Sequence, residues 1–209
     1  MEKEYKSLMD WKVWELVDLP KGWEPIKGRW VYAVKGDDCK RACFVVKGFT
    51  QGFSIDYEET FSPVTRFETV HLLLALVALE DWKLHAIDVK TAFLFGDLDE
   101  EIYMVQPEGC VKKGQEKKFC CLRRAIYGLK QAALQWNKQF HKSLLELGFQ
   151  HCLSDPGVYI KFIGDHLIIV VFYVDNALFM GSDKVLTLNT RNCSWIDGNP
   201  EILAKPKNI

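Results

Sequence analysis

Three features are absent from this 209-residue sequence: a long hydrophobic run, a paired cysteine motif and an excess of charge of either sign. The apolar runs Leu72–Leu79 and Leu167–Val174 have eight residues each, whereas a membrane-spanning helix needs about 20. The first ten residues are rich in charge and lack the apolar segment of a secretory signal peptide. We therefore expect an intracellular, cytoplasmic protein with no signal peptide and no transmembrane segment.

The seven cysteines do not form the usual disulfide or zinc-site patterns. Their number is odd, no Cys-x-x-Cys pair occurs, and Cys120 is adjacent to Cys121. We therefore predict reduced thiols. The chain is 48% hydrophobic and 26% charged, which is typical of one globular domain, with or without subdomains, that has a substantial core.

The net charge of −1 neither predicts nor excludes a nucleic-acid partner, but the basic residues are unevenly distributed. Nine Lys or Arg residues and a single acid lie between Cys110 and Lys142. Between Lys21 and Thr50, seven basic residues stand against three acids. Such segments suit a groove that binds phosphates, although charge alone favours ordinary solvated faces. Both explanations stay open at this point.

Hydrophobic periodicity predicts a mixture of strands and helices. Helices are expected over residues 2–9, 65–81 and 131–149, with Thr65 as the N-cap of the second and Gly148 just after the end of the third. Strands are expected over residues 14–17, 29–34, 42–49, 83–89, 101–107 and 158–162, and as a hairpin over 167–180. Because strands and helices do not alternate regularly, we predict an α+β fold.

The sequence from residue 184 onward differs from the rest. It shows no sustained hydrophobic period, and two prolines stand near its end. We therefore expect one domain over residues 1–183 and an unrelated, poorly ordered tail over residues 184–209.

Two aspartates stand out by their context. Asp88 ends a strand-like run, and Asp175 precedes Asn176 at the tip of the predicted hairpin in the segment "FYVDNALFM". Asp and Asn are common in tight turns, so an ordinary turn is the simplest interpretation. If the two strands are neighbours, however, both carboxylates meet at one edge of a sheet and suit Mg²⁺, a cation that prefers oxygen ligands.

Several long segments then point to a family. They are "GRWVYAVK", "VVKGFTQGFSIDYEETFSPVTRFETV", "LHAIDVKTAFLFGDLDEEIYMVQPEG", "AIYGLKQAALQW", "DPGVYI" and "YVDN". In these segments and in their order, the chain resembles the reverse transcriptase domain of copia-type retrotransposon polyproteins. The resemblance extends to about Asp183. It implies a right-hand polymerase fold with a fingers–palm core and an antiparallel palm sheet.

The resemblance also implies a two-metal site. Such polymerases hold two divalent ions at three acidic positions, which correspond here to Asp88, Asp175 and Asn176, the last in place of the usual second Asp. Asp88 and Asp175 are therefore the expected metal ligands, and two Mg²⁺ ions are the expected cofactor, bound more weakly because of Asn176. Two such ions assist attack by the primer 3′-hydroxyl on the α-phosphate and support the leaving pyrophosphate.

Three further positions correspond to nucleotide-binding residues of the family. Phe93 matches the bulky gate that rejects a ribose 2′-hydroxyl, although core packing alone explains a Phe. Gln131 matches the glutamine that contacts the incoming nucleotide, although it also suits a helix N-terminus. Arg41 keeps a charge for the triphosphate, whereas Cys43 replaces a second basic residue.

The sequence also departs from the family pattern. Ala133 and Leu134 replace a Pro and an Arg, and the segment after Asp183 does not resemble the helix, primer-gripping hairpin and thumb of the family. We therefore expect a truncated, partly degenerate RNA-directed DNA polymerase whose thumb is missing and whose activity is weak or absent.

The expected partners are an RNA template, a DNA primer and deoxynucleotide triphosphates, with no membrane and no prediction of oligomeric state. The alternatives left open are a non-catalytic nucleic-acid-binding remnant and a translated fragment without function.

Overall fold

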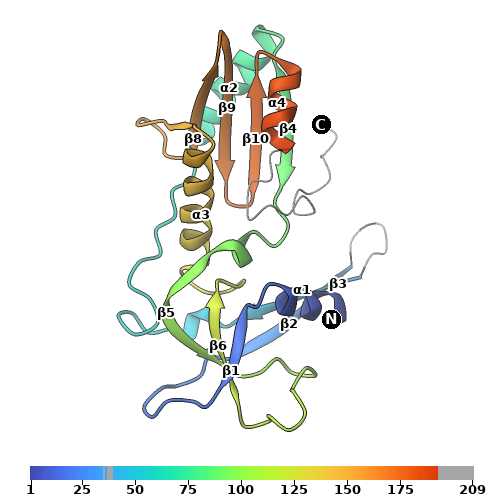
Figure 1. The fold of residues 1–209 in the computed structure, drawn as a ribbon, viewed down its shortest axis with the longest axis vertical. Coiled ribbons are helices and arrows are strands. Elements are labelled where there is room, and N and C mark those ends of the chain that lie inside the picture. Colours follow the sequence, from blue (N-terminus) through green and yellow to red (C-terminus); the bar gives the residue numbers. More distant parts are fainter. Residues whose placement is uncertain (35, 37–39, 193–209) are drawn as a thin grey trace. The chain divides into compact units, whose positions relative to one another are not determined.

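The computed structural model describes residues 1–34, 36 and 40–192. The chain divides into two compact units, each described here by itself (Figure 1). Unit 1 combines Met1–Phe61 with Phe93–Trp136, and unit 2 combines Ser62–Ala92 with Asn137–Ile209. Among the described residues, no helix is both long and apolar enough to cross a membrane.

Unit 1 contains a three-stranded antiparallel sheet and a separate β-hairpin. The sheet has the order β1-β6-β5, with β1 at Trp14–Val17, β6 at Phe119–Arg124 and β5 at Asp97–Met104. The hairpin strands are β2 (Gly28–Val34) and β3 (Lys40–Val46). Unit 1 also contains helix α1 (Glu2–Asp10) and the short 3₁₀ helices η1 (Gly48–Thr50) and η2 (Ala92–Phe95). The first residue of η2, Ala92, is the last residue of the unit 2 segment Ser62–Ala92.

One face of the three-stranded sheet forms the core of unit 1. Because side chains alternate between the faces of a strand, Ile102 and Met104 of β5 and Leu122 of β6 point to the same side, where they are buried with Phe44 and Ile126. Burying a large aliphatic or aromatic side chain of this kind contributes about 1.5–3 kcal/mol. This core therefore attaches the hairpin to the sheet.

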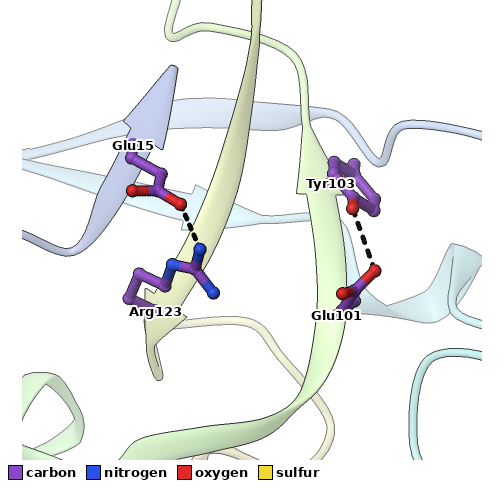
Figure 2. Close-up of polar contacts among 4 residues, drawn as sticks. All are labelled: Glu15, Glu101, Tyr103 and Arg123. Carbon is purple, nitrogen blue, oxygen red and sulfur yellow. Dashed lines mark hydrogen bonds and ion pairs between the residues drawn. The ribbon is translucent and has the colours of Figure 1, made fainter. Parts of the chain in front are cut away.

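The other face of this sheet carries a row of polar contacts (Figure 2). Glu15 of β1 forms an ion pair with Arg123 of β6, and the Tyr103 hydroxyl donates to Glu101, 3.0 Å away within β5. Trp23 covers the Tyr103 ring at a centroid distance of 5.1 Å. Burial, followed by the contact with Glu101, raises the pKa of Tyr103, so this phenol stays protonated and remains a donor.

Unit 2 is built on a five-stranded antiparallel sheet of order β4-β10-β9-β8-β7 (Figure 1). Its strands are β4 (Lys83–Asp88), β7 (Gln150–His151), β8 (Val158–Ile163), β9 (His166–Tyr173) and β10 (Asn176–Gly181). Its helices are α2 (Phe67–Leu79), α3 (Ala132–Glu146), which starts in the last residues of unit 1, and α4 (Lys184–Asn192).

Both faces of the five-stranded sheet are covered. Val77 of α2 packs with Val171 of β9 on one face, whereas the Phe140 ring of α3 stacks on Phe172, the next residue of β9, with centroids 4.1 Å apart. A strand covered on both sides needs apolar residues at consecutive positions. This requirement explains the unbroken apolar run in β9.

The predicted mixture of helices and antiparallel strands is confirmed. The expected N-cap of the second helix is wrong, since α2 begins at Phe67 with Arg66 as its N-cap and without a side-chain cap from its own chain segment. The Thr65 hydroxyl instead donates to the carbonyl of Phe172 at 2.7 Å. A tertiary partner has therefore replaced the local capping box. Gly148 follows α3 with a φ of 81°, as its predicted role requires.

The segment from residue 184, which we expected to be a poorly ordered tail, begins with a helix, α4, at Lys184–Asn192. Thr187 of this helix is fully buried beside Gly181 at the end of β10. The helix is stabilised by this contact with the sheet, which no sequence period reveals. Residues 193–209 of the expected tail lie outside the described residues.

Candidate active site

Asp88 and Asn176 are directly opposite each other on neighbouring antiparallel strands. The pairing of β4 with β10 places Asn176 across from Asp88 and Ala177 across from Ile87. Opposed residues of an antiparallel pair extend their side chains to the same face of the sheet. Two positions that are 88 residues apart in the sequence therefore share one face at one end of the sheet.

Asp175 is held at the same end by its backbone and by its side chain. Its carbonyl accepts a hydrogen bond from Val89 N at 2.8 Å, immediately after β4. Its carboxylate Oδ1 accepts a second one from Asn176 Nδ2, also at 2.8 Å. Asp88, Asp175 and Asn176 are all half-buried. The structure thus brings the three predicted positions together in unit 2.

The turn between β9 and β10 contains a backbone outlier. Tyr173 pairs with Asn176, so Val174 and Asp175 form a two-residue hairpin loop. Val174 has a φ of 58°, a region that favours glycine and is rare for β-branched residues. Such a conformation costs of the order of 1–3 kcal/mol and persists only where neighbouring contacts enforce it. Here the hydrogen bond from Val89 to Asp175 is one such contact.

The donor set suits a hard cation but carries only two carboxylates. Carboxylate oxygens and the amide oxygen of Asn are ligands that Mg²⁺ accepts. Within residues 1–34, 36 and 40–192, however, no three His, Cys, Asp or Glu side chains lie close enough to hold a metal ion. At this hairpin the two carboxylates of Asp88 and Asp175 are accompanied by the amide of Asn176.

The other predicted site residues belong to unit 1. Phe93 is half-buried, and its ring packs edge-on against Tyr127 with centroids 4.6 Å apart. Arg41 is exposed near the start of β3, opposite Ala33. Arg41 is therefore accessible to solvent, whereas Phe93 has the packing partner that a purely structural role requires.

Gln131 lies in a buried hydrogen-bond network. Its side chain is fully buried. Its Nε2 donates to the carbonyl of Asp56 at 2.8 Å, and its Oε1 accepts from Gln51 Nε2 at 3.0 Å. The Gln51 Oε1 in turn accepts from Lys130 N at 2.9 Å. Gln131 therefore joins the loop that follows η1 to the start of α3, a contact that the sequence did not reveal.

Cys43 faces an acidic side chain. It lies two residues beyond Arg41 on β3, and its Sγ is 3.4 Å from Glu4 Oε1 of α1. Burial, followed by the charge of Glu4, raises the pKa of Cys43 to about 11. The thiol is therefore protonated at neutral pH and poorly reactive.

Asp155 fixes the start of α2, a role that sequence reasoning missed. Its Oδ2 accepts from Arg66 N at 3.1 Å and from Thr69 Oγ1 at 2.6 Å, and its Oδ1 accepts from Gly157 N at 3.1 Å. Burial acts to raise the pKa of Asp155, but these hydrogen bonds outweigh it and lower the pKa. The sequence feature that could have indicated this role is the Asp-Pro-Gly turn that begins at Asp155.

Gly157 connects this cap to the strand that leads into the hairpin. Its carbonyl accepts from Phe172 N at 2.8 Å, and a Cβ at this position would overlap the Thr65 hydroxyl. Only glycine allows this approach. Asp155, Thr65 and Gly157 therefore fix the backbone of β9 three residues before Asp175.

Comparison with known proteins identifies the family of this chain. The chain belongs to the reverse transcriptase (RNA-dependent DNA polymerase) family, whose sequence model matches residues 11–192. It is 44% identical over 192 residues to the retrovirus-related Pol polyprotein from transposon TNT 1-94 of Nicotiana tabacum. It is 36% and 34% identical to the corresponding polyproteins from transposons RE2 and RE1 of Arabidopsis thaliana, each over 196 residues.

The matched segments cover most of this chain and a small part of each relative. They account for 89–91% of this chain but only 13–14% of the three polyproteins. The match thus confirms the expected resemblance to copia-type elements. The family match also extends to residue 192 and so includes α4.

Proposed function

We propose that this chain is the fingers–palm core of a copia-type RNA-directed DNA polymerase, with unit 2 as the palm and unit 1 as the fingers. The observation that carries the proposal is the pairing of Asp88 with Asn176 across β4 and β10, next to the turn that contains Asp175. This arrangement puts two carboxylates and an amide at one end of the unit 2 sheet, which an ordinary hairpin does not require.

Asp88 and Asp175 are the residues that would hold divalent ions, and Mg²⁺ fits their oxygen donors. When bound, such ions neutralise phosphate charge and assist the primer 3′-hydroxyl. Asn176 contributes an amide oxygen and no charge. Its Nδ2 also donates to Asp175, which competes with metal binding for the lone pairs of that carboxylate.

The activity expected from this arrangement is weak. Loss of one preorganised electrostatic group from an active site commonly costs about 3–4 kcal/mol, or roughly 10²- to 10³-fold in rate. Asn176 is such a loss, because it has nearly the shape of Asp without its charge.

The proposed substrates are deoxynucleotide triphosphates, added to a DNA primer on an RNA template. Arg41 is the proposed contact for the triphosphate, since its guanidinium is exposed and suits phosphate oxygens. Phe93 is the proposed gate against a ribose 2′-hydroxyl. For Gln131 we propose a supporting role, because its amide is committed to Gln51 and Asp56.

Primer extension on an RNA template tests the proposal. Extension by the native chain, by Asn176→Asp and by Asp88→Asn would be measured in the presence of Mg²⁺ at equal protein concentration. We expect slow extension by the chain, extension faster by about 10²-fold or more for Asn176→Asp, and none for Asp88→Asn. If Asn176→Asp binds primer–template but adds no nucleotide, the polymerase proposal fails and a binding module becomes the better interpretation.

A further inference from the structure

The inner face of helix α2 packs on the unit 2 sheet (Figure 1). Val77 is buried there, and Val70, Leu73 and Leu74 are partly buried in the cluster that includes Val171 of β9. The four helix residues follow the spacing i, i+3, i+4 and i+7, which defines one face of a helix. An ordinary surface helix with this inner face carries polar residues on its opposite face.

The outer face of α2 is apolar as well. Its outer stripe consists of Leu72, Ala75, Leu76 and Leu79, which repeat the same i, i+3, i+4, i+7 spacing and are all exposed. Leu72 is 69% exposed and Leu79 is 83% exposed. A helix that is hydrophobic all round is normally buried all round. Within the described part of the chain, the outer stripe lacks the cover that its sequence suits.

Acidic side chains stand at both ends of the outer stripe. Glu68 is in the first turn of α2, on the same face as Leu72, and Glu80 directly follows Leu79. Both glutamates are exposed. Among the described residues, the ion pairs are Lys83–Asp81, Lys118–Asp18 and Arg123–Glu15. Neither glutamate therefore has a cationic partner within this part of the chain.

The cations of unit 2 nearest to these ends in the sequence have other partners. Arg66 acts on Asp155, whose pKa it helps to lower, and Lys83 pairs with Asp81 at 3.5 Å. The ends of the outer stripe thus remain acidic.

The C-terminal end of α2 also favours a cation from outside. The carbonyl groups of a last helical turn carry partial negative charge, which Lys or Arg side chains stabilise. No basic residue stands in the last turn of α2, and Glu80 and Asp81 follow it instead. A cationic side chain of a partner would therefore be attracted by the helix end and by Glu80 together.

We propose that the outer stripe of α2 binds an amphipathic helix of a partner protein, whose apolar side chains are flanked by Lys or Arg. Recognition of a helix commonly uses apolar anchors at the spacing that the outer stripe presents. The small side chain of Ala75 leaves room for a partner side chain between Leu72 and Leu79. The basic residues of the partner would lie beside Glu68 and Glu80.

Two other occupants fit the charges less well. A second copy of α2 would bring glutamates together in either orientation, because Glu68 and Glu80 stand at opposite ends of the same face, and like charges repel. Helices that lie on membranes are typically rich in Lys and Arg, whereas this face ends in acids. The inference uses α2 alone and none of the residues of the polymerase proposal.

The test measures binding of two fluorescein-labelled synthetic helices to the whole chain. Each has about 16 residues, or roughly four turns, with leucines at i, i+3, i+4 and i+7. One peptide carries lysines beside the leucines and the other carries glutamates. The native chain should bind the lysine peptide at least about tenfold more tightly than the glutamate peptide.

Two sets of variants locate the site. Leu72→Gln with Leu79→Gln should weaken binding of the lysine peptide at least about tenfold, whereas Leu153→Gln, at a leucine that is 99% exposed elsewhere in unit 2, should not. Glu68→Gln with Glu80→Gln should reduce the preference for lysine over glutamate. Its control is Glu146→Gln, at the exposed end of α3. Because all of these side chains are exposed, the variants should fold.

Equal binding of the two peptides, or equal binding by the double leucine variant and Leu153→Gln, would overturn the proposal. Sedimentation equilibrium and flotation with phosphatidylcholine vesicles test the other occupants. Self-association or vesicle binding that requires Leu72 and Leu79, without binding of the lysine peptide, would also overturn it. Asp88→Asn should bind the lysine peptide like the native chain, so this proposal and the polymerase proposal can fail separately.

Discussion

Asp88 and Asn176 occupy opposed positions on β4 and β10, and the Val89 amide that follows β4 donates to the carbonyl of Asp175. The relationship places two carboxylates and one amide at the same end of the unit 2 sheet. Asn and Asp have nearly the same shape, so the hairpin can form with either residue at position 176. Cation binding, in contrast, depends on the charge of that residue.

Asn176→Asp should therefore strengthen metal binding without changing the fold. A unit charge about 4 Å from another at an effective dielectric constant near 20 contributes about 4 kcal/mol before desolvation, so we expect at least about a tenfold gain in Mg²⁺ or Mn²⁺ affinity. Calorimetric titration of both forms measures it, with Asp175→Asn as the variant that should bind less. Equal affinity of the native chain and Asn176→Asp would make position 176 a turn residue only.

Substitution of Asp155 should destabilise unit 2. Asp155→Ala leaves the amides of Arg66 and Gly157 and the hydroxyl of Thr69 without their acceptor. We expect a loss of roughly 2–3 kcal/mol in the free energy of unfolding, measured by urea denaturation. Asp165→Asn, at an exposed position before β9, is the matched control and should change stability little. A similar loss in both variants would contradict the assigned role.

The lowered pKa of Asp155 also predicts that the stability of the protein falls at acidic pH. The group binds protons more weakly in the folded protein than in the unfolded chain, whose carboxyl has a pKa of about 3.9. Its stabilisation is therefore complete above that value and is lost as pH falls through the folded pKa. Urea midpoints between pH 7 and pH 3 should fall less steeply for Asp155→Asn than for the native chain.

The lowered pKa of His141 predicts a second pH dependence of stability, at higher pH than that of Asp155. Burial, followed by the neighbouring His151, lowers the pKa of His141, whose Nδ1 lies 3.0 Å from the Tyr159 hydroxyl. The unfolded chain thus takes up this proton at a higher pH than the folded protein, and stability falls as pH drops below about 6.5. His141→Gln should reduce the change in Tm between pH 7.5 and pH 5.5. His166→Gln, exposed at the start of β9, should leave it unchanged.

Cys43→Arg should tighten binding of a deoxynucleotide with Mg²⁺, since Arg binds phosphate oxygens in a bidentate manner. Glu4 lies beside the thiol and would pair with the new guanidinium. The gain should therefore be larger, about five- to tenfold, when Glu4→Gln is added. Titration of the native chain, the single variants and the double variant measures these effects. Unchanged affinity in the double variant would exclude Cys43 as a cause of weak triphosphate binding.

The sequence by itself determined the α+β class, most strands and helices, and the family. The alternation and length of apolar runs predicted β4, the β9–β10 hairpin and α3, because these patterns reflect which faces are buried. The order of long motifs identified a reverse transcriptase, and it singled out Asp88, Asp175 and Asn176, whose local sequence otherwise suits an ordinary strand end or turn.

Only the tertiary structure decided which distant groups meet. Asp155 caps α2, Gln131 joins a buried network with Gln51, and Lys47 N donates to the carbonyl of Lys27. In each case the local sequence of these residues carries no periodic signal. The same holds for α4, which is stabilised by packing of Thr187 beside Gly181. A sequence pattern reports burial along one element, whereas a hydrogen bond or a charge contact depends on which second element lies opposite.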